Sequence, residues 1–250
     1  MAQPVVANPL EPLCEDWQRG LAIVAHPDDL EFGAAAAIAR WTGQGKHIVY
    51  CLVTSGEAGI DAMAPAQTRQ VREAEQRAAA AVVGVTVVEF LGQPDGIVEY
   101  GVPLRRVLAL VVRRHQPEIV ITNNFRDTWD GAVVLNQADH RATGRAVLDA
   151  ISDAGNRWVF PELLAEGLQP WGGVIQVWAA GSPDARHGVD ITATFVQGVA
   201  SLRAHEAYLR GLGAGTFDPQ AYLAELGQAA GVRLGTHYGA AFEVFYYTSR

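Results

Sequence analysis

The chain has 250 residues, of which 49% are hydrophobic and 18% are charged, so it is long enough to bury a sizeable core. Its net charge of −8 argues against a basic surface of the kind that binds nucleic acid or an anionic membrane. The first twenty residues show no signal-peptide pattern, and no apolar run is long enough to span a bilayer. We therefore expect a cytoplasmic protein with neither nucleic-acid nor membrane partners.

The sequence contains two cysteines, Cys14 and Cys51. Cys51 lies inside an apolar, strand-like run, which favours a buried thiol over one half of a disulfide bridge. This cysteine usage indicates a reducing compartment.

The first 150 residues alternate between two patterns. Residues 1–19 contain three prolines and no clear hydrophobic period, and we expect an irregular lead-in there. From residue 20 onward, short apolar runs alternate with longer helical patterns. The expected strands are 21–25, 47–54, 86–91 and 118–122, and the expected helices that follow them are 31–44, 66–83, 103–115 and 138–153. Four successive strand–helix units predict a mostly parallel sheet with helices on both faces.

Beyond residue 170 the pattern changes to expected strands near 174–180 and 242–247 and expected helices near 193–210 and 219–230. We interpret this part as the second half of the same layered fold, so that residues 20–250 form a single α/β domain. In such sheets, ligands bind at the carboxyl ends of the strands. The candidate positions are those that follow the first four expected strands, after Ala25, Thr54, Leu91 and Thr122.

The first strand is followed by His26, Pro27, Asp28 and Asp29. A histidine and two adjacent carboxylates at the end of a buried strand are unfavourable unless a cation or another partner compensates them. Pro27 favours extended geometry at the preceding residue and a helical turn after itself, so His26 and Asp29 can return to one point. That pair suits a divalent metal, whereas Asp28 points elsewhere. The alternative is an aspartate that caps the following helix, but one aspartate would suffice and the histidine would stay unexplained.

A second polar motif, ending at His140, follows the fourth strand after a loop of about a dozen residues. His140 is expected at the start of a helix beside the same strand edge, where it can supply a third metal ligand. A single histidine at a helix start is more often a surface residue, but two histidines and an aspartate at one sheet edge favour a metal. Three protein ligands leave one position open, which is typical of a catalytic zinc site.

The segments Ala25–Asp29 and Ala138–His140 resemble the PIG-L/LmbE-like family of N-acetylglucosaminyl deacetylases. The linking segments that also match are Val53–Glu57, Arg72–Val85 and Leu91–Gly96. The likeness covers residues 20–155 well and the remainder loosely. It implies a Rossmann-like fold with one deacetylase domain over 20–250. It also implies zinc as cofactor, with the ligands His26, Asp29 and His140, and it assigns Asp28 the role of general base.

The resemblance also implies two contacts to the sugar, from Arg72 and Asp95. Each has a simpler alternative: Arg72 can form a helix-surface ion pair with Glu75, and Asp95 can serve the Pro-Asp-Gly turn. Glu57, in a loop at the strand edge, is either a further site residue or an ordinary loop carboxylate.

The chain departs from the family at Gln137, where the family has the first histidine of a His-Pro-Asp-His motif. In the family that histidine is credited with stabilising the oxyanion or donating a proton. Glutamine can donate a hydrogen bond but cannot titrate, so Gln137 is expected to bind the substrate oxygen without supplying a proton. The alternative is that another histidine has taken over the proton, the candidates being His187, His205 and His237.

Together these features predict a metal-dependent hydrolase that removes an N-acetyl or other N-acyl group from an amino sugar or sugar conjugate. Iron, cobalt or nickel could replace zinc in this ligand set. The main alternative is a sugar- or nucleotide-binding module without hydrolysis, which the absence of a GxGxxG or Walker A motif disfavours. A serine hydrolase lacks its GxSxG motif, and a glycosyltransferase would leave the two histidines unexplained.

Two further expectations concern partners and tryptophans. Members of the family often form homo-oligomers, which makes a second copy of this chain a candidate partner. Three tryptophans in the later part of the chain can either stack on a sugar ring or fill the core, and we expect the core: Trp158, Trp171 and Trp178.

Overall fold

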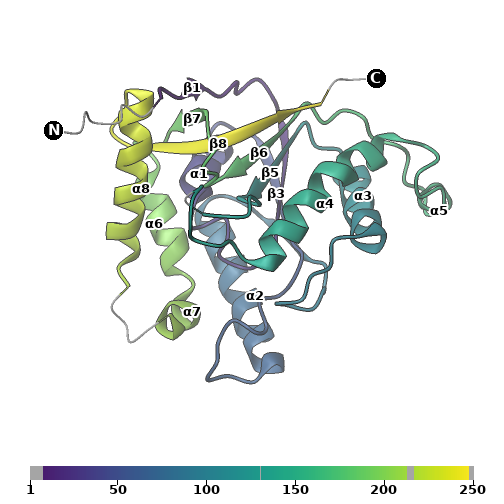
Figure 1. Cartoon of the computed structure of the whole chain (residues 1–250), viewed down its shortest axis with the longest axis horizontal. Coiled ribbons are helices and arrows are strands. Elements are labelled where there is room, and N and C mark those ends of the chain that lie inside the picture. The colour runs from purple at the N-terminus through teal and green to yellow at the C-terminus, as the bar shows by residue number, and fades with distance from the viewer. Residues whose placement is uncertain (1–7, 130, 213–216, 248–250) are drawn as a thin grey trace.

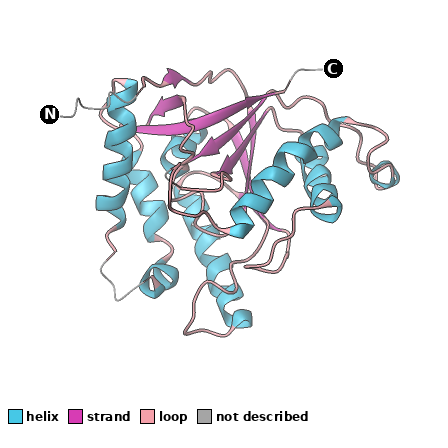
Figure 2. Ribbon diagram, in the orientation of Figure 1, coloured by secondary structure: helices cyan, strands magenta, loops and turns pink. Residues whose placement is uncertain are grey.

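A computed structural model describes residues 8–129, 131–212 and 217–247. It consists of one sheet between two layers of helices (Figure 1 and Figure 2). The expected single α/β domain with a mostly parallel sheet is therefore confirmed.

The sheet has eight strands in the described residues, in the order β1-β7-β8-β6-β5-β2-β3-β4. Their bounds are β1 Glu11–Pro12, β2 Arg19–Val24, β3 His47–Leu52, β4 Val87–Phe90, β5 Ile119–Asn123, β6 Gln176–Ala180, β7 His187–Asp190 and β8 Gly239–Tyr246. Only β8 runs antiparallel to its neighbours, β6 and β7. The central strands are buried on both faces, which is why they are almost continuously apolar in the sequence.

Helices cover both faces of this sheet. Their bounds are α1 Ala35–Gly43, α2 Pro65–Val82, α3 Val102–His115, α4 Ala138–Gly155, α5 Glu162–Ala165, α6 Phe195–Arg203, α7 Glu206–Gly211 and α8 Pro219–Leu234. Side chains of α1, α2, α6 and α8 contribute to one core and those of α3, α4 and α5 to the other. Among the described residues, no helix combines the length and the hydropathy needed to cross a membrane.

The strand order reverses direction at β2, and this creates the crevice in which a site can form. β2 pairs with β3 on one side and with β5 on the other. The helices that follow β2 and β5, α1 and α4, pack on opposite faces of the sheet. The loops after these two neighbouring strands therefore diverge, which is the point where such sheets bind their ligands.

Several expected elements differ from the observed ones. The helix expected over 31–44 begins only at Ala35, because residues 31–34 form turns after the polar loop. The single helix expected over 193–210 is wrong: α6 and α7 are separated at Ala204 and His205, since the His205 side chain is fully buried in the interior. In the expected lead-in, Glu11–Pro12 pair with β7 and Trp17 packs in the core.

The tryptophans and cysteines also have defined environments. Trp178 is fully buried and contacts Trp17 and Trp41, so it fills the core as predicted. Trp158, by contrast, is 77% exposed, and its assignment to the core is wrong. Cys51 is a buried free thiol whose pKa is raised by burial, and Cys14 is an exposed free thiol. The prediction of a thiol at Cys51 is therefore confirmed.

Candidate metal centre

The polar loop after β2 makes a sharp turn that separates its two aspartates. The backbone N–H of His26 donates to Asp29 Oδ2 at 2.8 Å, which folds Asp29 back onto the histidine. Asp28 has a φ of 88°, in the left-handed region that non-glycine residues rarely adopt. Its backbone N–H donates to Gln76 on α2 at 2.9 Å, and Arg72 donates to the Pro27 carbonyl. Helix α2 thus holds the turn in which the two carboxylates point in different directions.

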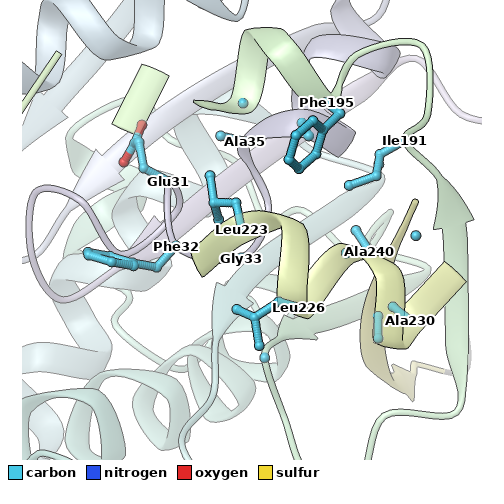
Figure 3. A pocket seen from close by; sticks show the side chains of 16 residues that line it. Glu31, Phe32, Gly33, Ala35, Ile191, Phe195, Leu223, Leu226, Ala230 and Ala240 are labelled. Atoms are coloured by element: carbon cyan, nitrogen blue, oxygen red, sulfur yellow. The ribbon is translucent and has the colours of Figure 1, made fainter. Parts of the chain in front are cut away.

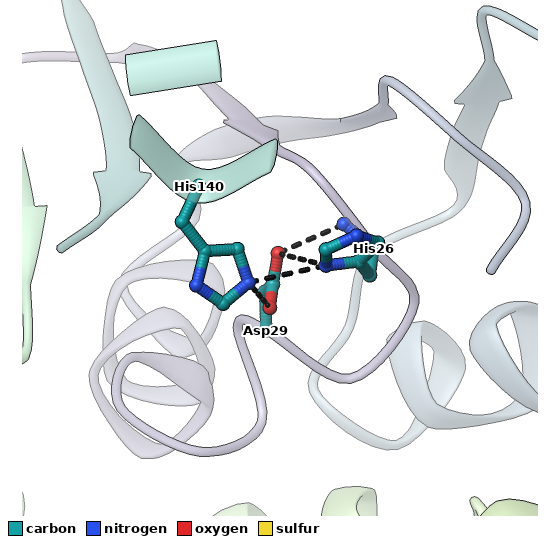
Figure 4. Close-up of side chains that lie close together, drawn as sticks. All are labelled: His26, Asp29 and His140. Carbon is teal, nitrogen blue, oxygen red and sulfur yellow. Dashed lines mark hydrogen bonds and ion pairs between the residues drawn. The ribbon is translucent and has the colours of Figure 1, made fainter. Parts of the chain in front are cut away.

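The three predicted ligands lie together at the carboxyl end of the sheet (Figure 4). His140 Nε2 lies 3.1 Å from His26 Nδ1 and 2.9 Å from Asp29 Oδ1. The third separation, between His26 Nδ1 and Asp29 Oδ2, is 3.7 Å. The two histidines are 114 residues apart in the sequence, and the parallel arrangement of β2 and β5 brings them to one point.

The contact with Asn136 determines which ring nitrogen of His140 carries a proton. Both hydrogens of the Asn136 amide are used, because Nδ2 donates to the carbonyls of Asn124 at 2.8 Å and Arg126 at 3.0 Å. Its Oδ1 is therefore the atom that faces His140 Nδ1, at 3.0 Å, and it can only accept. In the neutral ring, the His140 proton therefore lies on Nδ1, and Nε2 presents a lone pair to Asp29 and His26.

The carboxylates of Asp95 and Asp139 determine that one particular ring nitrogen of His26 carries a proton. His26 Nε2 lies 3.1 Å from Asp95 Oδ1 and 3.2 Å from Asp139 Oδ2, and both of these oxygens accept. Nε2 therefore carries a proton, and Nδ1 presents a lone pair toward His140. Pairs of a carboxylate and a histidine of this kind orient metal ligands in many proteins.

His26, Asp95 and Asp139 form a second group whose potential ligand atoms lie within 4.8 Å of one another. Backbone N–H groups already occupy its carboxylates: Asp139 accepts from Gly96 and Val98, and Asp95 accepts from Ala58. These two aspartates therefore support the His26 ring at Nε2, whereas the group that could hold a cation together with Asp29 and His140 includes the other ring nitrogen, Nδ1.

The donor set fits a divalent transition metal. When both imidazoles are neutral, two ring lone pairs and a carboxylate converge, an arrangement that is repulsive unless a proton or a metal cation compensates it. Burial lowers the pKa of His26, but Asp139, Asp29 and Asp95 outweigh it and raise that pKa. Tetrahedral zinc with bonds of about 2.0–2.1 Å would separate its ligand atoms by roughly 3.3 Å, within the range of the three observed separations. Zinc, iron, cobalt and nickel all accept such ligands.

The electrostatics of the cluster favour positive charge at this point. Burial alone raises the pKa of Asp29, but His140 and His26, in their protonated forms, outweigh it and hold that pKa well below its usual range. Burial likewise opposes ionisation of Asp95 and Asp139, yet hydrogen bonds from His26 and from the backbone lower both pKa values. The cluster therefore presents ionised carboxylates.

Asp28 is buried beside the cluster and is directed toward α2 and α7. Its Oδ2 accepts from Arg72 at 2.9 Å, and the ring of Tyr208 on α7 lies against the same guanidinium. Burial raises the pKa of Asp28 to about 6, although the positive charge of Arg72 lowers it. Of the two aspartates that follow Pro27, Asp29 is a predicted metal ligand with a lowered pKa, whereas Asp28 is not a predicted ligand and has a raised pKa.

Arg72, a predicted sugar contact, is only 2% exposed. Its guanidinium donates to Pro27, Gly56 and Asp28, and it lies 4.0 Å from the centre of the Tyr208 ring. The alternative of a surface ion pair with Glu75 is wrong, because Glu75 accepts from the backbone of Ala207 instead. Arg72 holds the polar turn in place, and a sugar contact stays a prediction.

The other predicted substrate contacts lie at the edge of the same site. Asp95 does more than form a turn, because its side chain contacts His26. Gln137 is exposed at the N-cap of α4, where its side chain makes no capping hydrogen bond. Contacts from Asp95 and Gln137 to a substrate stay predictions. Glu57 pairs with Arg69 and accepts from the backbone of Asp95, as a supporting loop carboxylate does.

The three histidines considered as replacements for the family histidine occupy different places. His187 lies on β7 beside Tyr246, and His237 contacts Tyr238. His205 is fully buried, with its Nε2 3.6 Å from Glu31, and the charge of Asp28 acts on its pKa. Of these three histidines, His205 is the one whose surroundings include the predicted base.

Tyr208, Asn136 and Trp129 contribute to this site although the sequence analysis did not select them. Tyr208 lies on α7, in the segment 193–210 that the sequence predicts as a single helix. Asn136 was visible in the sequence four residues before His140, a spacing at which a side chain can reach a residue in the first helical turn.

A separate cavity of about 150 Å³ lies between α1, α6 and α8 (Figure 3). Its lining is mainly hydrocarbon, from residues such as Phe195, Leu223 and Leu226, with Glu31 at one side. None of the predicted site residues lines it, so the predicted site lies outside this cavity.

Comparison with known proteins agrees with this geometry. Residues 21–151 match the family described as GlcNAc-PI de-N-acetylase (PIG-L). The diacetylchitobiose deacetylase of Thermococcus kodakarensis is 27% identical over 197 residues, which cover 77% of this chain and 70% of that protein. A probable N-acetyl-alpha-D-glucosaminyl L-malate deacetylase 2 of Bacillus anthracis is 32% identical over 140 residues, which cover 53% of this chain and 58% of that protein.

Among solved structures, the N,N'-diacetylchitobiose deacetylase from Pyrococcus horikoshii superimposes with a TM-score of 0.84 at 22% identity, over 93% of this chain and 85% of that one. At this level of identity the likeness shows the fold alone. The family match is stronger evidence, because it spans more than half of the chain and includes His26, Asp29 and His140. The resemblance inferred from the motifs is confirmed, and the chain belongs to the PIG-L family.

Proposed function

We propose that this protein is a zinc-dependent hydrolase that removes the N-acetyl group of an amino sugar or sugar conjugate. The observation that carries the proposal is the convergence of His26 Nδ1, His140 Nε2 and the Asp29 carboxylate, with a second carboxylate, Asp28, beside them. The names of the two curated relatives, both deacetylases of N-acetylated sugars, support the substrate class.

His26, Asp29 and His140 would hold the metal, which supplies a Lewis acid for the amide and lowers the pKa of water. The surrounding side chains keep these ligands in place before the metal arrives. Asn136 fixes the tautomer of His140, and the carboxylates of Asp95 and Asp139 fix that of His26. Such preorganisation reduces the free energy needed to assemble the site.

Asp28 is proposed as the general base. A pKa raised by burial suits a group that must accept a proton near neutral pH and release it again. Asp28 accepts a proton from the attacking water and then donates it to the departing amine. Arg72 holds the carboxylate in position for both transfers, and the Tyr208 ring packs against the Arg72 guanidinium.

Gln137 is proposed to donate a hydrogen bond to the amide oxygen as negative charge develops there. Its position at the exposed start of α4, three residues before His140, leaves the side chain available to a substrate at the metal. A neutral amide donor stabilises an oxyanion without changing its own protonation state.

The proposal is tested by incubating the zinc-loaded protein with N-acetylglucosamine, N,N'-diacetylchitobiose and N-acetylglucosaminyl malate and measuring released acetate. Activity should disappear on chelation and return with zinc. His140→Ala should lose both the metal and the activity, whereas His47→Ala, at an exposed position, should keep both. Binding of these sugars without release of acetate by the fully zinc-loaded protein would favour the sugar-binding module instead.

Two expectations about the whole protein are proposed with this function. The protein is expected to act in the cytoplasm and to assemble with further copies of itself. Light scattering at micromolar concentration would measure its oligomeric state, and a monomer would contradict the second expectation.

A further inference from the structure

Trp129 packs against His140, one of the predicted metal ligands. Its ring centre is 5.3 Å from that of His140, and the two ring planes are nearly perpendicular, at 86°. The imidazole is buried, whereas Trp129 is 38% exposed. Trp129 is therefore a partly exposed aromatic side chain in direct contact with a predicted metal ligand.

The loop that carries Trp129 is anchored by the same asparagine that orients His140. Asn136 donates through Nδ2 to the carbonyls of Asn124 and Arg126, and its Oδ1 accepts from His140. The backbone of Asn136 also donates to Asp127. One buried side chain thus fixes both the metal ligand and the segment that leads to the tryptophan.

Other contacts hold the two ends of this loop against the sheet. Asn124 donates from its side chain to the carbonyl of Thr128, and Thr128 forms a β-bridge with Leu135. Arg126 forms an ion pair with Glu243 on β8, which also accepts from Ser182. Because these contacts anchor the loop before a ligand arrives, the indole can bind without first being ordered.

The chemistry of an exposed indole beside an amide-cleaving centre suits a sugar ring. A pyranose has faces made of C–H groups and an edge of hydroxyl groups, and a tryptophan ring offers a broad, rigid apolar surface for such a face. The N-acetyl group of an amino sugar is attached directly to the ring. Amide cleavage at the metal therefore brings the ring within reach of residues that flank the ligands.

We propose that Trp129 is a substrate-binding residue that stacks on the pyranose ring carrying the scissile amide. Stacking selects cyclic amino sugars over acyclic N-acetyl compounds. This inference rests on the proposed deacetylation for its substrate class, but its contact can be measured without turnover.

The kinetic test compares Trp129→Ala, Trp129→Phe and a control, Trp158→Ala. Trp158 is an exposed tryptophan that follows the far end of α4, a helix length of roughly 25 Å from His140. For N-acetylglucosamine, Trp129→Ala should raise KM by roughly tenfold, as expected when an aromatic binding contact is truncated. Trp129→Phe should recover most of that loss, and Trp158→Ala should match the wild type.

The specificity arm uses an acyclic substrate, N-acetylethanolamine. Trp129→Ala should leave its kcat/KM unchanged, because this compound has no ring to stack. Equal losses for the cyclic and the acyclic substrate, or an unchanged KM for N-acetylglucosamine, would overturn the proposal. Zinc content measured in each variant separates loss of a sugar contact from loss of metal.

The binding arm titrates N-acetylglucosamine into the zinc-free full-length protein and follows tryptophan fluorescence. The fluorescence change should persist in Trp158→Phe and disappear in Trp129→Phe. If acetate is never released but this dependence on Trp129 holds, the stacking contact stands and the proposed function fails. If acetate is released and the fluorescence change is absent or independent of Trp129, the proposed function stands and the stacking contact is refuted.

Discussion

Asn136 and His140 are joined by a hydrogen bond of 3.0 Å between the amide Oδ1 and the ring Nδ1. This contact determines which ring nitrogen of His140 is free for a metal, because the Asn136 amide hydrogens are already used by two backbone carbonyls. The position of one buried amide thus links the loop after β5 to the metal centre.

Replacement of Asn136 should weaken metal binding. We expect Asn136→Ala to raise the zinc dissociation constant by roughly 10- to 100-fold, the usual effect of losing a residue that orients a histidine ligand. Competition with a chromogenic chelator measures this constant. Asn136→Asp keeps an acceptor for His140 but loses both amide donors to the backbone carbonyls, so its zinc affinity should lie between those of the wild type and Asn136→Ala. Equal affinities of wild type and Asn136→Ala would show that the hydrogen bond does not orient the ligand.

Replacement of Asp28 should separate catalysis from metal binding. Asp28→Asn keeps the shape of the side chain but cannot accept the proton, so kcat should fall by roughly two to four orders of magnitude. Zinc content should be unchanged, because Asp28 lies outside the ligand set. Asp61→Asn, at an exposed aspartate, should behave as wild type. Loss of zinc in Asp28→Asn would make Asp28 a ligand or a structural residue.

Replacement of Gln137 tests which residue takes the role of the histidine that the family has at this position. Gln137→Ala should lower kcat/KM by about a hundredfold, the effect of removing one donor to an oxyanion, with no loss of zinc. Gln137→His should introduce a new pKa into the pH profile of kcat/KM. If Gln137→Ala is nearly silent while His205→Gln abolishes turnover in a folded, zinc-loaded protein, the buried histidine has taken over the proton.

The Glu31–His205 pair should make stability depend on pH. Burial lowers the pKa of His205, but Glu31 and Asp28 outweigh burial and the opposing charge of Arg72, so the net pKa is raised. A raised folded-state pKa contributes stability that is complete below the ordinary histidine value of about 6.5 and is lost as the pH rises through the folded value.

At pH 6, His205→Gln should lower the unfolding free energy by about 3 kcal/mol, because Glu31 is left buried without a charged partner. The difference from wild type should shrink as the pH rises, since wild-type His205 then also loses its charge. Denaturant unfolding from pH 6 to pH 10 measures both effects, with His47→Gln, at an exposed position, as control. A difference that grows with pH would contradict the assignment of a charged pair.

Much of the sheet and of the predicted ligand set follows from local patterns in the sequence. Buried parallel strands are continuously apolar, and each is followed by a helix of regular period, so the first four strand–helix units could be recognised in order. Polar residues at the ends of such strands meet at one edge of the sheet. His26 and His140 could therefore be predicted to meet although 114 residues separate them.

The rest depended on contacts between distant segments. No local pattern shows that β8 pairs antiparallel between β6 and β7, because that pairing is set by how the end of the chain returns to the sheet. The 193–210 segment has a continuous helical pattern, yet burial of His205 beside Glu31 breaks it. The same break places Tyr208 over Arg72 and Asp28.

By itself, the sequence determined the fold class, the family and the predicted ligand set, because each of these is written in short segments with a fixed period or spacing. The tertiary structure alone decided the roles of the supporting residues. Arg72 is buried and holds the turn at Asp28, and Trp129, not Trp158, packs against the predicted ligand His140. The physical reason is that burial and orientation depend on packing between segments far apart in the chain, which no local pattern contains.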